Sequence, residues 1–212
     1  MWLALVALFV AVSAPAQARA QKEVPVSGSA GKVEKVAKDR EVALLAGGCF
    51  WGMQDILRKI PGVLETQAGY TGGWLANPKY DDTHDSKSGH AESVRVVFDP
   101  RLLSYEDLLE KWFFRMHDPT TPNRQGNDVG TQYRSGVYAY GDAHRSAAEA
   151  SRSMFQRRLS AAGFGPITTE ILPAPDFFYA EEYHQQYLAK NPSGYCGLGG
   201  TGVACPSGVH AS

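Results

Sequence analysis

Short apolar runs, each closed by glycine or proline, recur along the chain from residue 42 onwards. Runs of this length that are rich in β-branched and aromatic residues and bounded by turn formers are typical of β-strands. We therefore predict strands at residues 42–46, 63–70, 93–98, 136–140 and 167–172.

Helical periodicity is clearest at residues 104–116, where apolar residues recur every three or four positions. Ser104 is placed to cap this helix, and we expect its apolar stripe to face the core. That stripe consists of Tyr105, Leu108, Leu109, Trp112, Phe113 and Met116. Further helices are predicted at 50–60, 142–162 and 180–190, and a polar loop at 118–132. Asp142 is expected to cap the helix at 142–162, with Ala143, Ala147, Ala150 and Met154 on one side.

Strands and helices interleave in this pattern, but two predicted strands also follow each other directly. This order favours a single α+β domain over residues 41–191, built as a two-layer sandwich. The segment 192–212 is rich in glycine and is too poor in apolar residues to form a core by itself. We expect it to be a coil-like mobile tail that lies on the domain.

The first forty residues differ from the rest. Residues 2–12 are apolar and small residues follow up to Ala20, which predicts a cleavable signal peptide at 1–20. Residues 21–40 are polar and predict a flexible linker. The protein would then be exported, to the periplasm or outside the cell. However, no Lys or Arg precedes the apolar run. The alternatives of an uncleaved membrane anchor and of a wrongly chosen start codon therefore stay open, and the protein would then be membrane-anchored or cytoplasmic.

Charge and cysteine content narrow the possible functions. The 212 residues carry 21 basic and 22 acidic side chains, a formal net charge of −1. Such a balance argues against bulk attraction to nucleic acids or anionic membranes. The 3 cysteines are too few for a disulfide scaffold or a four-cysteine zinc site. An odd number also leaves at least one thiol outside any intramolecular pair.

Cys49 lies between the predicted strand at 42–46 and the predicted helix at 50–60, flanked by Gly47, Gly48 and Gly52. Backbone N–H groups at the start of a helix favour an anion, so we expect a lowered thiol pKa and a reactive sulfur. A buried structural cysteine is the alternative interpretation. Such a cysteine needs neither the glycines nor the two aromatic residues that follow it.

Cys196 and Cys205 are separated by residues 197–204, which are mostly small. A disulfide across this loop is sterically easy, and so is its exchange with a third thiol. A static bridge that pins the tail is one alternative. A zinc site with three cysteines and a histidine is another, although the spacing is unlike that of known zinc motifs.

Several segments form an ordered set along the chain: GCFWG at 48–52, NPKY at 77–80, GHAE at 89–92, HDPTT at 117–121, RQGNDVGTQYRS at 124–135, and the tail from 195 to 206. The set resembles the peptide methionine sulfoxide reductase A family and covers about residues 41–206. The match of ordered segments is far more specific than a single motif. With this resemblance we expect the sandwich to have a ferredoxin-like core.

The resemblance implies removal of oxygen from the S-epimer of methionine sulfoxide, free or within proteins, and so the repair of oxidised proteins. Cys49 would attack the sulfur and become a sulfenic acid. Cys196 would condense with it to a disulfide, and Cys205 would then take over that bond. No bound cofactor or metal is implied. A thioredoxin or thioredoxin-like protein would serve as the external thiol reductant.

The same resemblance implies roles for the side chains around the nucleophile. Glu92 corresponds to the acid of the family, and burial would raise its pKa. Tyr80 and Tyr133 correspond to two phenols that donate to the sulfoxide oxygen. The implied substrate-binding residues are Phe50 and Trp51, as an aromatic wall for the S-methyl group, and Asp128.

Other function classes stay open at this point. A cysteine peroxidase would not need Glu92 or the phenols, and a cysteine acyl-transferase would need a histidine base beside Cys49. A sulfoxide-binding or redox-sensing module without turnover would need only one resolving thiol. We expect a monomer that meets oxidised proteins, peptides or free methionine sulfoxide and a reductant, without nucleic acid or stable membrane contact.

Overall fold

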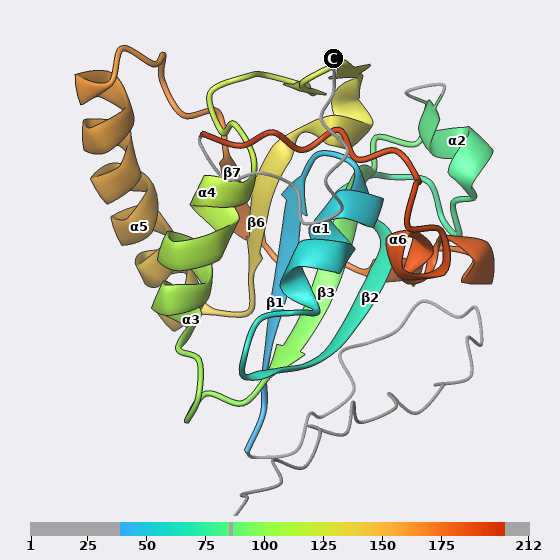
Figure 1. Ribbon diagram of the computed structural model, residues 1–212, viewed down its shortest axis with the longest axis horizontal. Coiled ribbons are helices and arrows are strands. Elements are labelled where there is room, and N and C mark those ends of the chain that lie inside the picture. The colour runs from blue at the N-terminus through green and yellow to red at the C-terminus, as the bar shows by residue number, and fades with distance from the viewer. Residues whose placement is uncertain (1–38, 85–86, 202–212) are drawn as a thin grey trace, which may run out of the picture.

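The computed structural model describes residues 39–84 and 87–201. The predicted signal peptide, nearly all of the linker and Cys205 lie outside these residues. Within them, one six-stranded sheet has the strand order β7-β6-β1-β3-β2-β8 (Figure 1). Its strands are β1 (Glu41–Gly47), β2 (Val63–Thr71), β3 (Ala91–Phe98), β6 (Ser135–Ala139), β7 (Glu170–Pro173) and β8 (Phe177–Tyr179). All neighbours are antiparallel except β6 and β7.

The helical elements are α1 (Phe50–Leu57), α2 (Tyr80–His84), α3 (Tyr105–Asp107), η1 (Leu108–Phe113), α4 (Phe114–Met116), η2 (Thr131–Tyr133), α5 (Asp142–Ala161), η3 (Glu182–His184) and α6 (Tyr187–Lys190). The helix expected at 104–116 is present as α3, η1 and α4, but its middle part, η1, is a π-helix. Ser104 caps it, since its hydroxyl oxygen accepts from the Asp107 N–H at 3.1 Å. Its apolar stripe lies in or against the main core, as predicted.

Alternation along β1 divides the apolar residues between the two faces of the sheet. Ala43 and Leu45 point into the main core, which also holds the apolar sides of α1, α3, η1 and α4. Leu44 and Ala46 belong to a smaller cluster on the other face. The prediction of one domain that mixes helices with a sheet is therefore confirmed.

Some local predictions were wrong. The residue at the N-cap of α5 is Gly141, because the Asp142 carboxylate turns to Arg145 instead, at 2.8 Å. Of the row expected on one side of this helix, Ala147 and Met154 pack partly buried against the main core. The fully buried side chains of α5 are the neighbouring Ala148, Ser151, Phe155 and Leu159.

The helix expected at 180–190 is interrupted. Gln186 adopts a positive φ of 51°, and its N–H donates to Gln54 Oε1 at 2.7 Å rather than to a helical carbonyl. The adjacent Gln185 side chain donates to the carbonyls of Ala68 and Ala180, both at 2.9 Å. Hydrogen bonds across the fold thus replace those that a continuous helix would make, leaving η3 and α6 as separate short elements.

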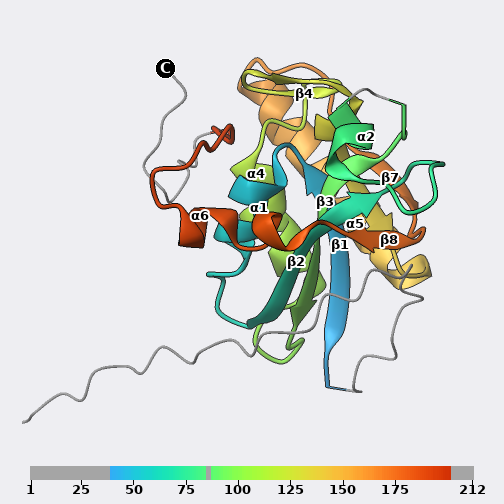
Figure 2. The ribbon, with the colours of Figure 1, turned by 90° about the vertical axis from the view of Figure 1, so that its right-hand side faces the viewer.

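The polar segment 118–132 is not a plain loop. It contains the short hairpin of β4 (Arg124–Gln125) and β5 (Asp128–Val129), followed by η2. This hairpin, α2 and the turn after β1 gather at one end of the sheet, and the segment after α6 crosses the same end (Figures 1 and 2). Among the described residues, no helix combines the length and the apolar composition needed to cross a membrane.

Candidate active site

Cys49 sits in the turn that joins β1 to α1, as predicted. It occupies the N-cap position of α1, and its thiol is free and 7 % exposed. Gly48 has a φ of +101°, a conformation that side-chain-bearing residues rarely adopt. A Cβ at Gly48 would also lie 2.7 Å from Cγ of Gln125. The turn therefore needs glycine for both its backbone conformation and its close packing.

The predicted lowering of the Cys49 pKa is wrong for this state of the site. Burial raises the pKa of the thiol well above its usual value, and the charge of Glu92 raises it further. Backbone N–H groups of Trp51 and Gly52 act in the opposite direction, as expected at the start of a helix. Their effect is smaller, because the buried sulfur is removed from the water that would solvate a thiolate.

Glu92 lies in β3, the strand next to β1, and its side chain is 1 % exposed. Its Oε2 accepts from the backbone N–H of Phe50 at 3.0 Å, so the carboxyl is held directly beside the first residue of α1. Burial raises the pKa of Glu92 to about 8, and the Phe50 N–H opposes this shift. The carboxyl is therefore mostly protonated at neutral pH and can donate a proton next to Cys49.

Two phenols share this environment. Tyr80 begins α2, Tyr133 ends η2, and both side chains are half-buried. Burial raises the pKa of each phenol, followed by the negative charge of Glu92; Cys49 and Asp128 contribute in the same direction. The pKa values of Tyr80 and Tyr133 are raised by the same charged groups, so the two phenols lie around one site. Both phenols stay protonated at neutral pH and remain hydrogen-bond donors.

Phe50 and Trp51 extend from the first turn of α1. Phe50 is fully buried, whereas Trp51 is partly exposed and stacks on Tyr187 with ring centroids 3.9 Å apart. The Trp51 indole N–H donates to Nδ1 of His184 at 2.9 Å. Trp51 is therefore held in one orientation at the edge of the site.

His184 belongs to the site although sequence analysis did not identify it. Its ring lies 4.4 Å from that of Tyr80 and 5.1 Å from that of Phe50, measured between centroids. His184 thus joins the aromatic residues of α1 to the phenol on α2. The hydrogen bond to Trp51, which joins residues 133 positions apart, has no signature in the sequence.

Glu181 was missed for the same reason. Its carboxylate accepts from the Tyr80 backbone N–H at 3.1 Å and from the Tyr70 hydroxyl at 2.8 Å. Its Oε2 also lies 4.0 Å from Nε2 of His184. These contacts anchor the start of α2, and with it the Tyr80 phenol, to the sheet.

The tail segment packs directly on the site. Cys196 and Leu198 are 1 % and 3 % exposed and belong to the main core, so this part of the tail is more than a coil resting on the surface. A Cβ on Gly52 would lie 2.8 Å from Sγ of Cys196, which places the Cys196 sulfur against α1. Cys196 is disulfide-bonded in this state, and Cys205 lies outside the described residues.

Asp128 of β5 is covered by the same segment. Its Oδ1 accepts from the Tyr195 hydroxyl at 3.2 Å. Its Oδ2 is buried without a hydrogen-bond partner among the described residues. One carboxylate oxygen of Asp128 therefore retains its capacity to accept a hydrogen bond at the site.

The arrangement is a buried thiol with a proton-donating carboxyl, two phenols and an aromatic wall. The family described as peptide methionine sulfoxide reductase matches residues 41–201, most of the chain. The chain belongs to the peptide methionine sulfoxide reductase family. Members of this family are enzymes, and the matching curated relatives are of the MsrA type.

Relatives and solved structures support this assignment. The peptide methionine sulfoxide reductase MsrA 1 of Synechocystis sp. is 58 % identical over 172 residues, which are 81 % of this chain and 77 % of the relative. The structure of methionine sulfoxide reductase A of Corynebacterium diphtheriae is 42 % identical, with a TM-score of 0.71, and the match covers 80 % of this chain and 83 % of that one. Saccharomyces cerevisiae Mxr1 in complex with Trx2 is 26 % identical, with a TM-score of 0.50 and coverage of 74 % and 91 %.

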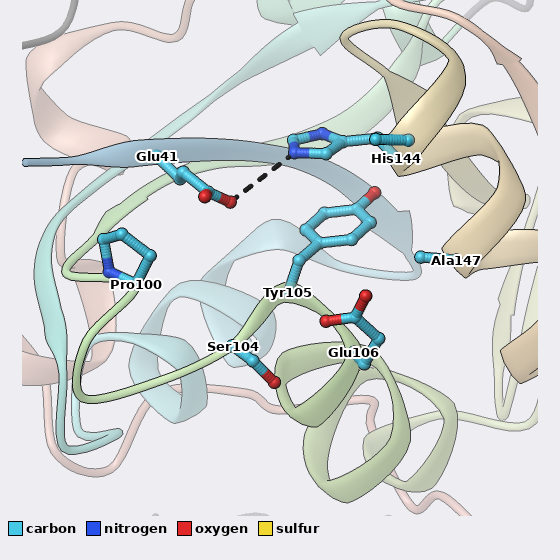
Figure 3. A pocket seen from close by; sticks show the side chains of 8 residues that line it. Glu41, Pro100, Ser104, Tyr105, Glu106, His144 and Ala147 are labelled. Atoms are coloured by element: carbon cyan, nitrogen blue, oxygen red, sulfur yellow. Dashed lines mark ion pairs between the residues drawn. The ribbon is translucent and has the colours of Figure 1, made fainter. Parts of the chain in front are cut away.

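The reductase chain also has a cavity of about 300 Å³ far from Cys49, around Glu41 at the opposite end of β1 (Figure 3). Its polar lining includes Tyr105, Glu106 and His144, whose Nε2 lies 3.7 Å from Oε2 of Glu41. No cysteine lines it. In the part of the chain that the structure describes, no three Asp, Glu, His or Cys residues are grouped to hold a metal ion.

Proposed function

We propose that this enzyme reduces the S-epimer of methionine sulfoxide, free or within oxidised proteins, by a cysteine relay. The observation that carries the proposal is the position of Glu92. Its buried carboxyl, held by the N–H of Phe50 and protonated at neutral pH, lies beside the thiol at the start of α1. A cysteine peroxidase has no use for such an acid, whereas a sulfoxide is a poor electrophile until its oxygen is protonated.

In the first step Cys49 Sγ attacks the sulfoxide sulfur. The Phe50 N–H occupies Glu92 Oε2, so the carboxyl proton resides on Oε1 and passes to the sulfoxide oxygen. Glu92 then takes up the proton that Cys49 loses. The hydroxyl group then passes from the substrate sulfur to Cys49 Sγ while the transient bond between the two sulfur atoms breaks, so that methionine leaves and Cys49 carries the oxygen as a sulfenic acid. Protonation of Glu92 also removes the negative charge that opposes formation of the thiolate.

In the later steps the thiol of Cys196 attacks the sulfenic acid, which releases water and forms the Cys49–Cys196 disulfide. The position of Cys196 Sγ against Gly52 supports this role, since Gly52 follows Cys49 by less than one helical turn. The thiol of Cys205 then attacks Cys196 and regenerates the Cys49 thiol. A thioredoxin-like dithiol would reduce the resulting Cys196–Cys205 bond. The complex of the related yeast protein with Trx2 supports this choice of reductant.

The substrate side chain would lie between the phenols and Trp51. Trp51 presents an aromatic face for the S-methyl group and is held by His184, while Phe50 backs the wall from the core. The unpartnered oxygen of Asp128 would accept a backbone N–H of the substrate once the tail has moved.

The phenols offer a test of oxygen activation. Replacing Tyr80 or Tyr133 by Phe removes one donor to the sulfoxide oxygen, and each change is expected to lower kcat by about tenfold to a hundredfold. The double variant is expected to fall further, because no phenol then stabilises the developing charge. Tyr140→Phe, which alters a half-buried phenol outside the site, is the matched control. A wild-type kcat in the double variant would exclude this role.

The direct test of the reaction uses the two separated sulfoxide epimers of an N-blocked methionine, with dithiothreitol as reductant. We expect methionine to form from the S-epimer alone. Reduction of the R-epimer would contradict the proposed specificity. If neither epimer were reduced by folded protein, while Cys49 were oxidised by peroxide, the site would be that of a peroxidase.

A further inference from the structure

His117 is fully buried, and the chemistry proposed above does not use it. It follows α4 directly and lies against the turn that carries Cys49. A Cβ on Gly47 would lie 3.1–3.3 Å from three atoms of the His117 ring, so the imidazole packs against the backbone of β1 at its last residue. Any side chain at position 47 would displace this ring.

The hydrogen bonds of His117 define its protonation state. Nδ1 lies 2.8 Å from the carbonyl oxygen of Phe113, which can only accept, so Nδ1 carries the proton. Burial lowers the pKa of the ring to about 4, so His117 is neutral and Nε2 is an acceptor. The hydroxyl of Ser135 therefore donates to Nε2 at 2.7 Å. The Thr169 hydroxyl in turn donates to Ser135 Oγ at 2.8 Å.

This chain connects two parts of the active site. Ser135 is the residue of β6 that pairs with Gly47 in the sheet, and it follows Tyr133 by two positions. Gln125 packs against the same turn. Its Oε1 accepts from the Asp118 N–H at 2.9 Å, and its Cγ packs against Gly48. Residues of the segment 117–125 thus pack against both glycines that precede Cys49.

We propose that His117 is a positioning residue. Through its hydrogen bond with Ser135, it fixes the position of the turn that carries Cys49 relative to β6, the strand that follows Tyr133. The proposal rests on the reaction proposed above, in which Cys49 and Tyr133 must meet the same sulfoxide group. Misplacement of a reacting group by about 1 Å can lower a rate by about a hundredfold. His117 therefore acts on the chemical step without touching the substrate.

The test is the single-turnover rate of methionine formation in His117→Phe, which keeps a ring of similar size but neither hydrogen bond. We expect the rate constant to fall about tenfold to a hundredfold, and the half-saturating substrate concentration to stay within about threefold of wild type. His117→Gln, whose amide oxygen can still accept from Ser135, is expected to recover most of the loss. His144→Phe likewise keeps a ring but removes the contact of Nε2 with Glu41 at the far end of β1; it is the control and should leave the rate unchanged (Figure 3).

Ser135→Ala removes the same bond by deleting one hydroxyl, and it replaces His117→Phe if that variant does not fold. Since both changes act through one contact, the double variant is expected to be no slower than the slower single variant. Additive losses, or a wild-type rate in a folded His117→Phe protein, would overturn the proposal.

A second measurement does not depend on the proposed reaction. In a Cys196→Ser, Cys205→Ser background, Cys49 is the only thiol left in the chain, and its alkylation by iodoacetamide is followed against pH. In His117→Phe the midpoint is expected to move to higher pH, because the N–H groups of Trp51 and Gly52 lose their alignment on the sulfur. An unchanged midpoint would count against positioning even if the wild-type protein reduced no sulfoxide. A shifted midpoint together with an inactive wild type would refute the reaction and not the role of His117.

Discussion

Cys49→Ser protein is expected to form methionine from the S-sulfoxide at least about a thousandfold more slowly than wild type. A serine hydroxyl is far less nucleophilic than a thiol, and it cannot pass through the sulfenic acid that Cys196 resolves. The fold should be unaffected, because serine is close to cysteine in size and the Cys49 side chain makes no capping hydrogen bond within the described residues.

The matched control is Cys196→Ser without any reductant. This variant keeps the nucleophile and should release about one methionine per protein molecule before it stops, whereas Cys49→Ser should release none. Equal release from both variants would show that the sulfur atom that attacks the substrate is not that of Cys49. Thermal unfolding of both proteins checks that neither result reflects loss of structure.

Glu92→Gln is expected to lower kcat at pH 7 by about a hundredfold to a thousandfold. The amide oxygen can still accept from the Phe50 N–H, so α1 keeps its contact with β3. The amide cannot transfer a proton to the sulfoxide oxygen. The loss therefore measures proton donation, with little contribution from packing.

The raised pKa of Glu92 also predicts in which direction kcat changes with pH. Burial raises the pKa of Glu92 from 4.5 to about 8, so the acid is protonated below that pH and loses its proton above it. Wild-type kcat should therefore fall as pH rises through about 8, and this decline should be absent in Glu92→Gln. Glu149→Gln, a change of an exposed carboxylate on α5, should keep both the rate and the decline. A decline that persists in Glu92→Gln would assign it to another group.

Local signals were sufficient for the elements that hold the nucleophile. The apolar run of β1, the paired glycines after it and the Pro-Gly that follows α1 identified strand, turn and helix correctly. Each signal is carried by neighbouring residues, whose steric and solvation preferences act over a few positions. The stripe of the segment 105–116 was found for the same reason, although the π-helical turn within it was not.

Several of the shortest elements escaped prediction. The β4–β5 hairpin and α2 are too short to show a period, and β8 exists because its aromatic residues pair with the edge strand β2. The break at Gln186 depends on hydrogen bonds with Gln54, which is 132 positions away. Such bonds are made only after the chain has folded. The helical propensity of the segment 180–190 therefore predicts a continuous helix that the structure does not contain.

The sequence by itself determined the family and the identities of the candidate residues, because the chemistry of the side chains and the order and spacing of the motifs can be read directly from the sequence. Only the tertiary structure decided their electrostatic state and their supports. The start of a helix predicts an acidic thiol at Cys49, but burial beside Glu92, from a strand more than forty positions away, raises its pKa. Likewise, the contacts that hold Trp51 and the nucleophile turn come from His184 and His117. Burial and long-range contacts depend on how distant segments pack, and no short window of sequence contains that information.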